Sequence, residues 1–212
     1  MYDVYFLFQI TAFIFCLAMY RKLNFPYKFF APFLFLITVY EALTLSGLLQ
    51  LNHSSMWSFN IFTSLEFAFY GLVLLSLIKN RIQKKIFYYS LVATLTLTIV
   101  YIIFLNQFNA FNTYTFILQS FVFITACCMY YYFKVQHART EILILNEPAF
   151  WLYTGLLFYY LGGFLFFASY SKMDFKQSPN YLILYRIVMN VSNIILYSCL
   201  IKLFLCFRTT KI

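Results

Sequence analysis

The sequence is poor in charge: only 10% of its 212 residues are Asp, Glu, Lys or Arg, whereas 64% are hydrophobic and 24% are aromatic. Soluble domains typically carry about 25% charged residues and about 45–50% apolar ones. With a mean hydropathy of +0.80, the chain lacks the polar groups needed to cover its apolar surface in water. The composition therefore excludes a soluble enzyme, a disordered chain and a disulfide-stapled secreted domain, and it predicts an integral membrane protein.

Glycine and proline are also scarce, with 5 and 4 residues. The prolines fall in predicted loops or first helical turns, so the adjacent Gly162 and Gly163 are the one break signal inside an apolar run. Close helix packing explains this pair as well as a broken helix does. Transporter sites favour broken helices and repeated halves, and the chain has no internal repeat. These scarcities disfavour a transporter.

Histidine is nearly absent, and the two that occur, His53 and His137, are predicted on opposite faces of the membrane. A zinc or haem site needs ligands close together at one depth, which excludes a site built on this pair within one chain. No C-x-x-C, Gly-rich phosphate loop, G-x-S-x-G or H-E-x-x-H motif occurs. We therefore predict no metal, no cofactor and no catalytic residue.

Long apolar runs fill most of the chain. A transmembrane helix needs about 20 apolar residues, with a range of ~17–25. Only short polar breaks separate the runs, which leaves no room for a soluble domain. The sequence predicts an all-α fold: a polytopic helical membrane bundle of seven transmembrane helices that forms one domain over residues 1–212. The predicted spans are Val4–Tyr20, Phe29–Gln50, Ser55–Ile78, Ile86–Leu105, Thr113–Phe133, Pro148–Tyr170 and Pro179–Phe207.

The basic residues predict the orientation, because cytoplasmic loops carry an excess of Lys and Arg. One side holds only Lys172 and Lys176, and Arg186 lies within the last span. We therefore expect the N-terminus outside and the C-terminus in the cytoplasm. This topology and anionic headgroups account for the net charge of +9 without nucleic acid. The other side carries Arg21, Lys22, Lys28, Lys79, Arg81, Lys84, Lys85, Lys134, Arg139, Lys202, Arg208 and Lys211.

Lys202 in the last span raises the question of a retinal Schiff base, since rhodopsins carry a lysine in their seventh helix. It lies close to the predicted cytoplasmic end of the span. Long basic side chains near a span end extend to the headgroups. We expect Lys202 to do so rather than to hold retinal.

Three ionisable residues are predicted near the bilayer midplane: Glu41, Glu66 and Arg186. Counted from the outer ends of their spans, their depths are roughly 14, 16 and 11 Å by the helical rise. Two carboxylates and one guanidinium leave an excess negative charge, which a low-dielectric site disfavours. We therefore expect one glutamate to be protonated, or a cation to bind there. If Arg186 pairs with Glu66, Glu41 is the neutral one; the reverse assignment also fits.

Helical spacing adds polar neighbours to these three. Asn190 and Asn193 follow Arg186 on one face of the last span, Tyr70 follows Glu66 by one turn, and Gln119 lies at a similar depth. The cytoplasmic half is mostly apolar and aromatic, so the pattern predicts a pocket with a floor rather than a pore. A purely structural polar network is the alternative. The candidate ligand-binding residues are Glu41, Glu66, Arg186, Asn190, Gln119, Tyr70 and Asn193.

The segment from Asn60 to Phe67, N-I-F-T-S-L-E-F, resembles uncharacterised seven-span bacterial membrane proteins with an N-x5-E-F pattern in the third helix. The resemblance implies a third helix that runs from outside to inside, in a bacterial inner membrane, and it implies no activity. Seven spans with an outer N-terminus also resemble bacterial sensory input domains. Those are normally joined to a kinase or a similar output, so signalling here needs a separate partner protein.

Together these observations favour a non-enzymatic membrane protein of sensor or accessory type. It would bind a small polar or lipid ligand in an outward-facing intramembrane pocket, with membrane lipids and a separate signalling or complex partner as its partners. A structural or assembly subunit of a membrane complex is the first alternative. A lipid-modifying intramembrane enzyme and a proton- or cation-coupled transporter are the further ones, so enzymatic activity stays open.

Overall fold

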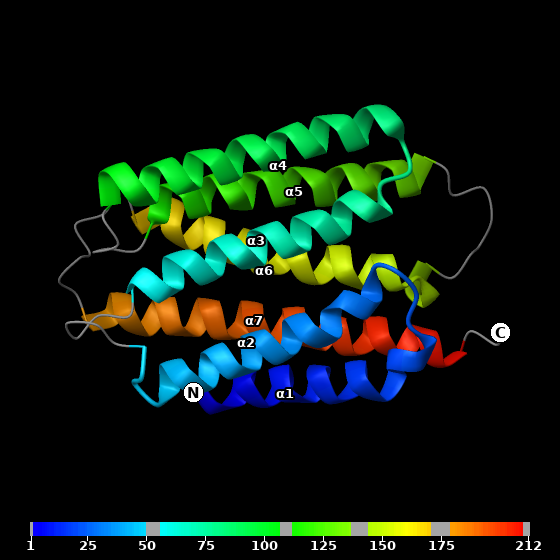
Figure 1. Ribbon diagram of the computed structural model, residues 1–212, viewed down its shortest axis with the longest axis horizontal. Coiled ribbons are helices and arrows are strands. Elements are labelled where there is room, and N and C mark those ends of the chain that lie inside the picture. Colours follow the sequence, from blue (N-terminus) through cyan, green and yellow to red (C-terminus); the bar gives the residue numbers. More distant parts are fainter. Residues whose placement is uncertain (1, 50–55, 107–111, 137–143, 171–178, 210–212) are drawn as a thin grey trace. The chain divides into compact units, whose positions relative to one another are not determined.

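The computed structural model describes residues 2–49, 56–106, 112–136, 144–170 and 179–209. Within these ranges the regular structure is helical, without strands, and seven helices are long and apolar enough to cross a membrane. This confirms the predicted all-α membrane fold with seven spans, while the sides of the two termini stay predictions. The helices are α1 (Tyr2–Met19), α2 (Phe30–Leu45), α3 (Met56–Leu77), α4 (Arg81–Tyr101), α5 (Thr113–Gln136), α6 (Pro148–Tyr170) and α7 (Pro179–Thr209) (Figure 1).

Helix α2 ends at Leu45, before the predicted end of the second span. Gly47 has a φ of 76°, a left-handed conformation that glycine adopts without a clash at Cβ. The backbone N–H of Leu48 donates to the carbonyl of Leu43 at 3.2 Å, and that of Gly47 donates to Thr44 at 3.1 Å. This pair of bonds is the Schellman motif that ends helices, so the glycine stops α2 although the sequence stays apolar.

Helix α4 begins at Arg81 rather than at Ile86, where the apolar run starts. Asn80 caps it: the side-chain oxygen accepts the backbone N–H of Ile82 at 2.9 Å and that of Gln83 at 3.4 Å. Asn is among the preferred N-cap residues because it satisfies N–H groups that have no partner in the first turn. The cap therefore extends α4 into the basic segment before the apolar run.

The chain forms two compact units. Unit 1 consists of Met1–Thr38 and Phe123–Ile212, and unit 2 consists of Val39–Val122. Helices α2 and α5 each contribute to both units, because their residues are divided at Thr38 and at Phe123. The single domain expected over residues 1–212 stays a prediction.

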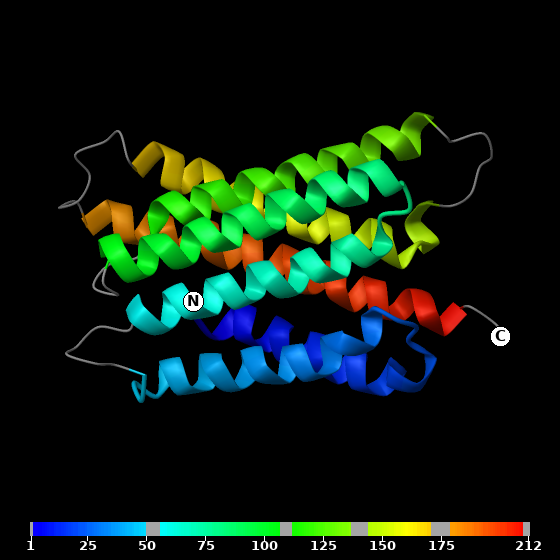
Figure 2. The same ribbon diagram turned by 45° about the horizontal axis from the view of Figure 1, so that its top comes forward.

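In unit 1, α7 packs against α1 on one side and α6 on the other (Figures 1 and 2). Gly155 of α6 lies so close to α7 that a Cβ there would be 2.9 Å from the Cβ of Cys199 and 3.4 Å from the Cα of Leu196. Gly162 faces the side chain of Ser192 in the same way. Small residues let membrane helices approach closely. Since α6 runs unbroken past Gly162, close packing is the correct explanation for this glycine.

The connection between α1 and α2 is anchored to the last turns of α7. It contains two short 3-10 helices, η1 (Tyr20–Lys22) and η2 (Tyr27–Phe29). The ring of Tyr27 packs edge-on against Phe207 at 5.3 Å between centroids, and Phe30 packs edge-on against Phe204 at 5.9 Å. Edge-to-face contacts of this kind are favourable for aromatic rings. They place the α1–α2 connection beside the end of α7.

In unit 2, α3 packs against α4, as Figure 2 shows. Gly71 of α3 lies under the side chain of Leu91 of α4, whose Cδ2 would be 2.6 Å from a Cβ on the glycine. Both residues are buried. The missing Cβ of Gly71 thus leaves space for the end of the Leu91 side chain. In unit 1, the missing Cβ of Gly155 leaves space for the backbone of α7.

Candidate functional site

The two acids predicted near the midplane, Glu41 on α2 and Glu66 on α3, both belong to unit 2. Both residues are half-buried. Each carboxyl group lies within electrostatic range of the hydroxyl group of Tyr40. Glu66 of α3 therefore lies in the same region of unit 2 as Tyr40 and its chain neighbour Glu41.

Tyr40 joins the end of α2 to α3. Its ring stacks on Phe62 with centroids 3.8 Å apart and planes 3° apart, and it meets Phe59 edge-on at 6.1 Å. The hydroxyl groups of Ser58 and Thr44 lie beside the tyrosine hydroxyl. An aromatic side chain with a polar tip can pack its body and keep its tip among polar groups. Tyr40 does both, and its ring thereby holds the last turns of α2 against α3.

The N-x5-E-F pattern of α3 divides into two structural residues and one charged one. Asn60 is 1% exposed, and its side-chain oxygen accepts the backbone N–H of Asn112 at 3.0 Å. Asn112 in turn caps α5, because its side chain accepts the N–H of Thr115 at 3.2 Å. Phe67 is fully buried. Asn60 and Phe67 therefore hold unit 2 together, whereas Glu66 brings a charge to a half-buried position.

Tyr70 and Gln119 take different places in unit 2. Tyr70 is fully buried, one turn after Glu66, and lies within electrostatic range of that carboxyl group. Gln119 is 2% exposed, and its side-chain amide donates to the hydroxyl of Thr98 at 3.2 Å. Tyr70 is thus a neighbour of the acidic pair, and Gln119 links α5 to α4. A role of either in ligand binding stays a prediction.

The other three predicted site residues lie on α7 in unit 1. Arg186 is exposed, Asn190 is buried and Asn193 is half-buried. The side-chain nitrogen of Asn190 finds no hydrogen-bond acceptor among the residues that the structure describes. The predicted set is therefore distributed over both units, with the acids and Tyr70 in one and the arginine and asparagines in the other. Whether Arg186 pairs with either acid stays a prediction.

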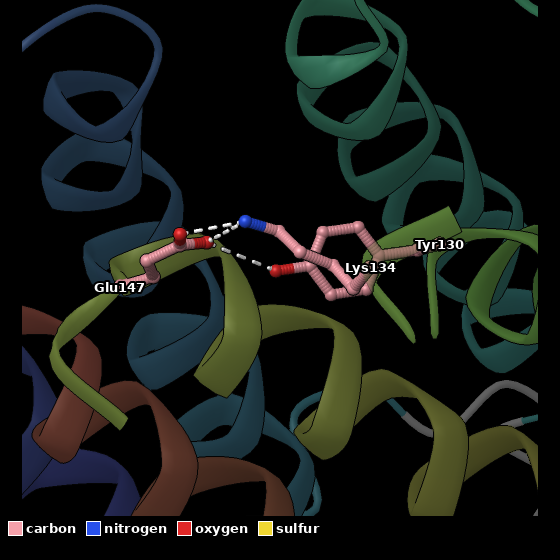
Figure 3. A network of polar contacts seen from close by, with 3 residues as sticks. All are labelled: Tyr130, Lys134 and Glu147. Carbon is pink, nitrogen blue, oxygen red and sulfur yellow. Dashed lines mark hydrogen bonds and ion pairs between the residues drawn. The ribbon is translucent and has the colours of Figure 1, made fainter. Parts of the chain in front are cut away.

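A polar network that the sequence did not predict joins α5 to α6 in unit 1 (Figure 3). Lys134 near the end of α5 forms an ion pair with Glu147, which directly precedes α6, and donates a hydrogen bond to it at 2.6 Å. The hydroxyl of Tyr130 donates to the same carboxylate at 3.4 Å. The lysine nitrogen also lies 6.0 Å from the centre of the Tyr130 ring. One carboxylate thus binds two side chains of α5.

Tyr130 and Tyr131 of α5 also contact residues of α6 beside this network. Tyr130 stacks on Tyr153 with centroids 4.0 Å apart and planes 5° apart. The hydroxyls of Tyr131 and Thr154 share a hydrogen bond of 2.6 Å. The sequence does contain a signal for the ion pair, namely opposite charges at the two ends of one short connection between helices. These contacts fix the end of α5 against the start of α6, which is a structural role.

Metal ligands do not gather in the part of the chain that the structure describes: no three His, Cys, Asp or Glu side chains there could hold one ion. His53 and His137, on which the sequence argument about metals turned, lie outside the described residues.

No protein family model, no curated protein and no solved structure matches this chain. The function must therefore be argued from its own residues.

Proposed function

We propose that this integral membrane protein is a non-enzymatic sensor or accessory protein that binds a small polar or lipid ligand. In this proposal Glu41 and Glu66 contact the ligand in an intramembrane pocket open to the outer side. The observation that supports it is that Glu41 and Glu66, both in unit 2, each lie within electrostatic range of Tyr40. Ionisable side chains inside a membrane are costly, and they typically mark ligand, ion or proton sites.

The charge balance indicates what kind of group binds. Near the midplane the spans supply two acids, Glu41 and Glu66, and one base, Arg186. Whichever acid the arginine neutralises, one negative charge is left over, and the low dielectric of the membrane makes it unfavourable. A ligand that brings a cationic group or a donated proton removes this cost. A polar headgroup or a small amine fits that requirement better than an anion does.

The surroundings of the acids favour such a contact. Phe59, Phe62 and the ring of Tyr40 pack together on α2 and α3, the two helices that carry the acids. An environment that excludes water strengthens hydrogen bonds to a charged group. A ligand headgroup bound to Glu41 or Glu66 would therefore gain more here than at the membrane surface.

In the same proposal, α7 carries the response to the cytoplasmic side. Arg186, Asn190 and Asn193 follow one another at helical spacing in its outer half. The distribution of basic residues supports an outer N-terminus and a cytoplasmic C-terminus. The N-x5-E-F resemblance supports a bacterial cytoplasmic membrane, and a separate protein would receive the signal.

Native mass spectrometry of the protein, extracted gently in its own lipids, tests the proposal. We expect the wild type to retain one small molecule or one lipid species. Glu66→Gln and Glu41→Gln should each lose it, because a neutral amide no longer holds the cationic or proton-donating group. Glu147→Gln is the matched control: it makes the same chemical change at a carboxylate that already binds Lys134, and it should retain the ligand.

Two results would contradict the proposal. If wild type and all three variants retain the same molecules, the acidic pair has no binding role. If the wild type instead carries one stoichiometric protein that Arg186→Ala, Glu41→Gln and Glu66→Gln leave in place, the chain is an assembly subunit and the acids are architectural.

A further inference from the structure

Four exposed basic residues lie at one end of unit 1. Arg21, Lys22 and Lys28 lie in the connection between α1 and α2, and Arg208 lies near the end of α7. Lys28 follows Tyr27, and Arg208 follows Phe207; these two rings are in contact, with centroids 5.3 Å apart. In Figures 1 and 2 the α1–α2 connection lies beside the end of α7. We call these four residues the basic corner.

The charges of the basic corner have no partner among the described residues. None of the four side chains forms an ion pair or a hydrogen bond with another described residue. Among the described residues, Glu147 lies within electrostatic range of Tyr27, but it is engaged by Lys134 and Tyr130 (Figure 3). The corner therefore presents positive charge that is available to an outside partner.

Exposed aromatic rings accompany these charges. Phe25 is 72% exposed and Phe29 is 53% exposed, and the two rings pack edge-on at 5.7 Å. Exposed rings interleaved with Arg and Lys are typical of segments that lie in the interface between headgroups and acyl chains. The α1–α2 connection therefore carries both an apolar group for lipid chains and a cationic group for headgroups.

The direction of Arg208 on α7 supports a defined site. By the helical repeat, Arg208 is displaced by about 40° from Phe204, the residue that contacts Phe30 of α2, whereas Lys202 is displaced by about 160°. Arg208 thus lies closer than Lys202 to the side of α7 that meets the start of α2, and Lys202 lies on the opposite side. Both residues are exposed. The same helix therefore supplies one basic residue to the corner and one away from it.

We propose that the basic corner binds the phosphate group of an anionic phospholipid, with Phe25 and Phe29 against its acyl chains. Guanidinium and ammonium groups are the usual partners of phosphate. Basic residues close to a span end are attracted to anionic headgroups. The site is distinct from the acidic pair of unit 2, and it does not depend on the ligand proposed there.

The test measures the binding of phosphatidylglycerol to the purified protein in micelles of a neutral detergent. Native mass spectrometry counts the lipids retained, and thermal unfolding measures the stabilisation. The corner variant is Lys22→Gln/Lys28→Gln/Arg208→Gln. The control variant is Lys84→Gln/Lys85→Gln/Lys202→Gln, which removes the same charge from exposed positions outside the corner. Thermal unfolding with phosphatidylcholine checks that both variants are folded.

We expect the corner variant to bind phosphatidylglycerol at least about 20-fold more weakly than the wild type, because each basic residue at an anionic headgroup contributes several-fold. The control variant should bind within about threefold of the wild type, and phosphatidylcholine should not distinguish the proteins. Equal losses in both variants would show diffuse attraction and overturn the site. Unchanged binding in the corner variant, or the same stabilisation by inorganic phosphate alone, would overturn it as well.

Discussion

The contact between α6 and α7 in unit 1 is made at glycines, whereas α5 in unit 2 is linked to α3 and α4 by buried amide side chains. Gly155 and Gly162 of α6 leave no room for an additional Cβ against α7. In unit 2, Asn60 of α3 binds the backbone at the start of α5, and Gln119 of α5 binds a threonine of α4. The polar contacts between α5 and α6 in unit 1 gather at one end, around Glu147.

The difference shows two ways to hold helices together where lipid removes the hydrophobic driving force. Close backbone contact gains dispersion energy and depends on shape, so it fails when volume is added. A buried amide contact depends on polarity, so it fails when one partner is removed and the other is left unsatisfied. The α6–α7 contact and the amide links of α5 should therefore respond to opposite kinds of substitution.

Asn60→Ala should give the largest effect, about 2–3 kcal/mol of lost stability, because it leaves the buried N–H of Asn112 without its acceptor. The free energy of unfolding in detergent or lipid, measured by steric trapping, checks this. Ser64→Ala is the control, since the hydroxyl of Ser64 donates to a carbonyl of its own helix. Similar losses of stability in both variants would mean that the hydrogen bond to the start of α5 contributes no more than a hydrogen bond within α3.

Gly155→Ala should cost about 2 kcal/mol, because the new methyl group meets Cβ and Cα atoms of α7 that move only if the helices separate. Gly162→Ala is the matched control on the same helix. The nearest atom there is the hydroxyl oxygen of Ser192, which a side-chain rotation removes, and alanine gains helix propensity of about 1 kcal/mol over glycine. We expect Gly162→Ala to stay within about 0.5 kcal/mol of the wild type. Equal effects of the two substitutions would show that a methyl group placed against the backbone of α7 costs no more than one placed against a side chain.

The sequence predicted the parts of the fold that depend on apolar length, and missed those that depend on local hydrogen bonds. Seven spans followed from composition and run length alone. The end of α2 before Gly47 and the start of α4 after Asn80 could not be predicted in this way. A turn can end a helix inside an apolar run, and a cap can start a helix ahead of one, and neither changes the hydropathy of the run.

The candidate site was predictable in part for a similar reason. Rare charges in apolar spans can be recognised in the sequence, and Glu41 and Glu66 each lie within electrostatic range of Tyr40. The partner of a polar residue cannot be recognised in the same way. Gln119 was grouped with the acids by depth, yet its amide binds Thr98, because depth along a helix does not specify the direction of a side chain around it.

Glu147→Gln should have a smaller effect, at most about 1 kcal/mol, because the side chains of Lys134 and Glu147 are 36% and 32% exposed and water screens their attraction. Thermal unfolding at low and high salt checks this. The difference between variant and wild type should shrink as salt rises. A loss above about 2 kcal/mol that is insensitive to salt would show that the polar end of unit 1 resembles the buried links of unit 2.

The smallest expected effect tests the comparison most directly, because it isolates one buried hydrogen bond between two helices. A double-mutant cycle of Gln119→Leu and Thr98→Val removes each partner of the α4–α5 hydrogen bond separately and then together. Side-chain hydrogen bonds between membrane helices average about 0.6 kcal/mol, and we expect a coupling energy of that size from unfolding measured by steric trapping. Both residues are buried, so screening by water does not reduce it. A coupling energy near zero would mean that Thr98 does not hold the side chain of Gln119.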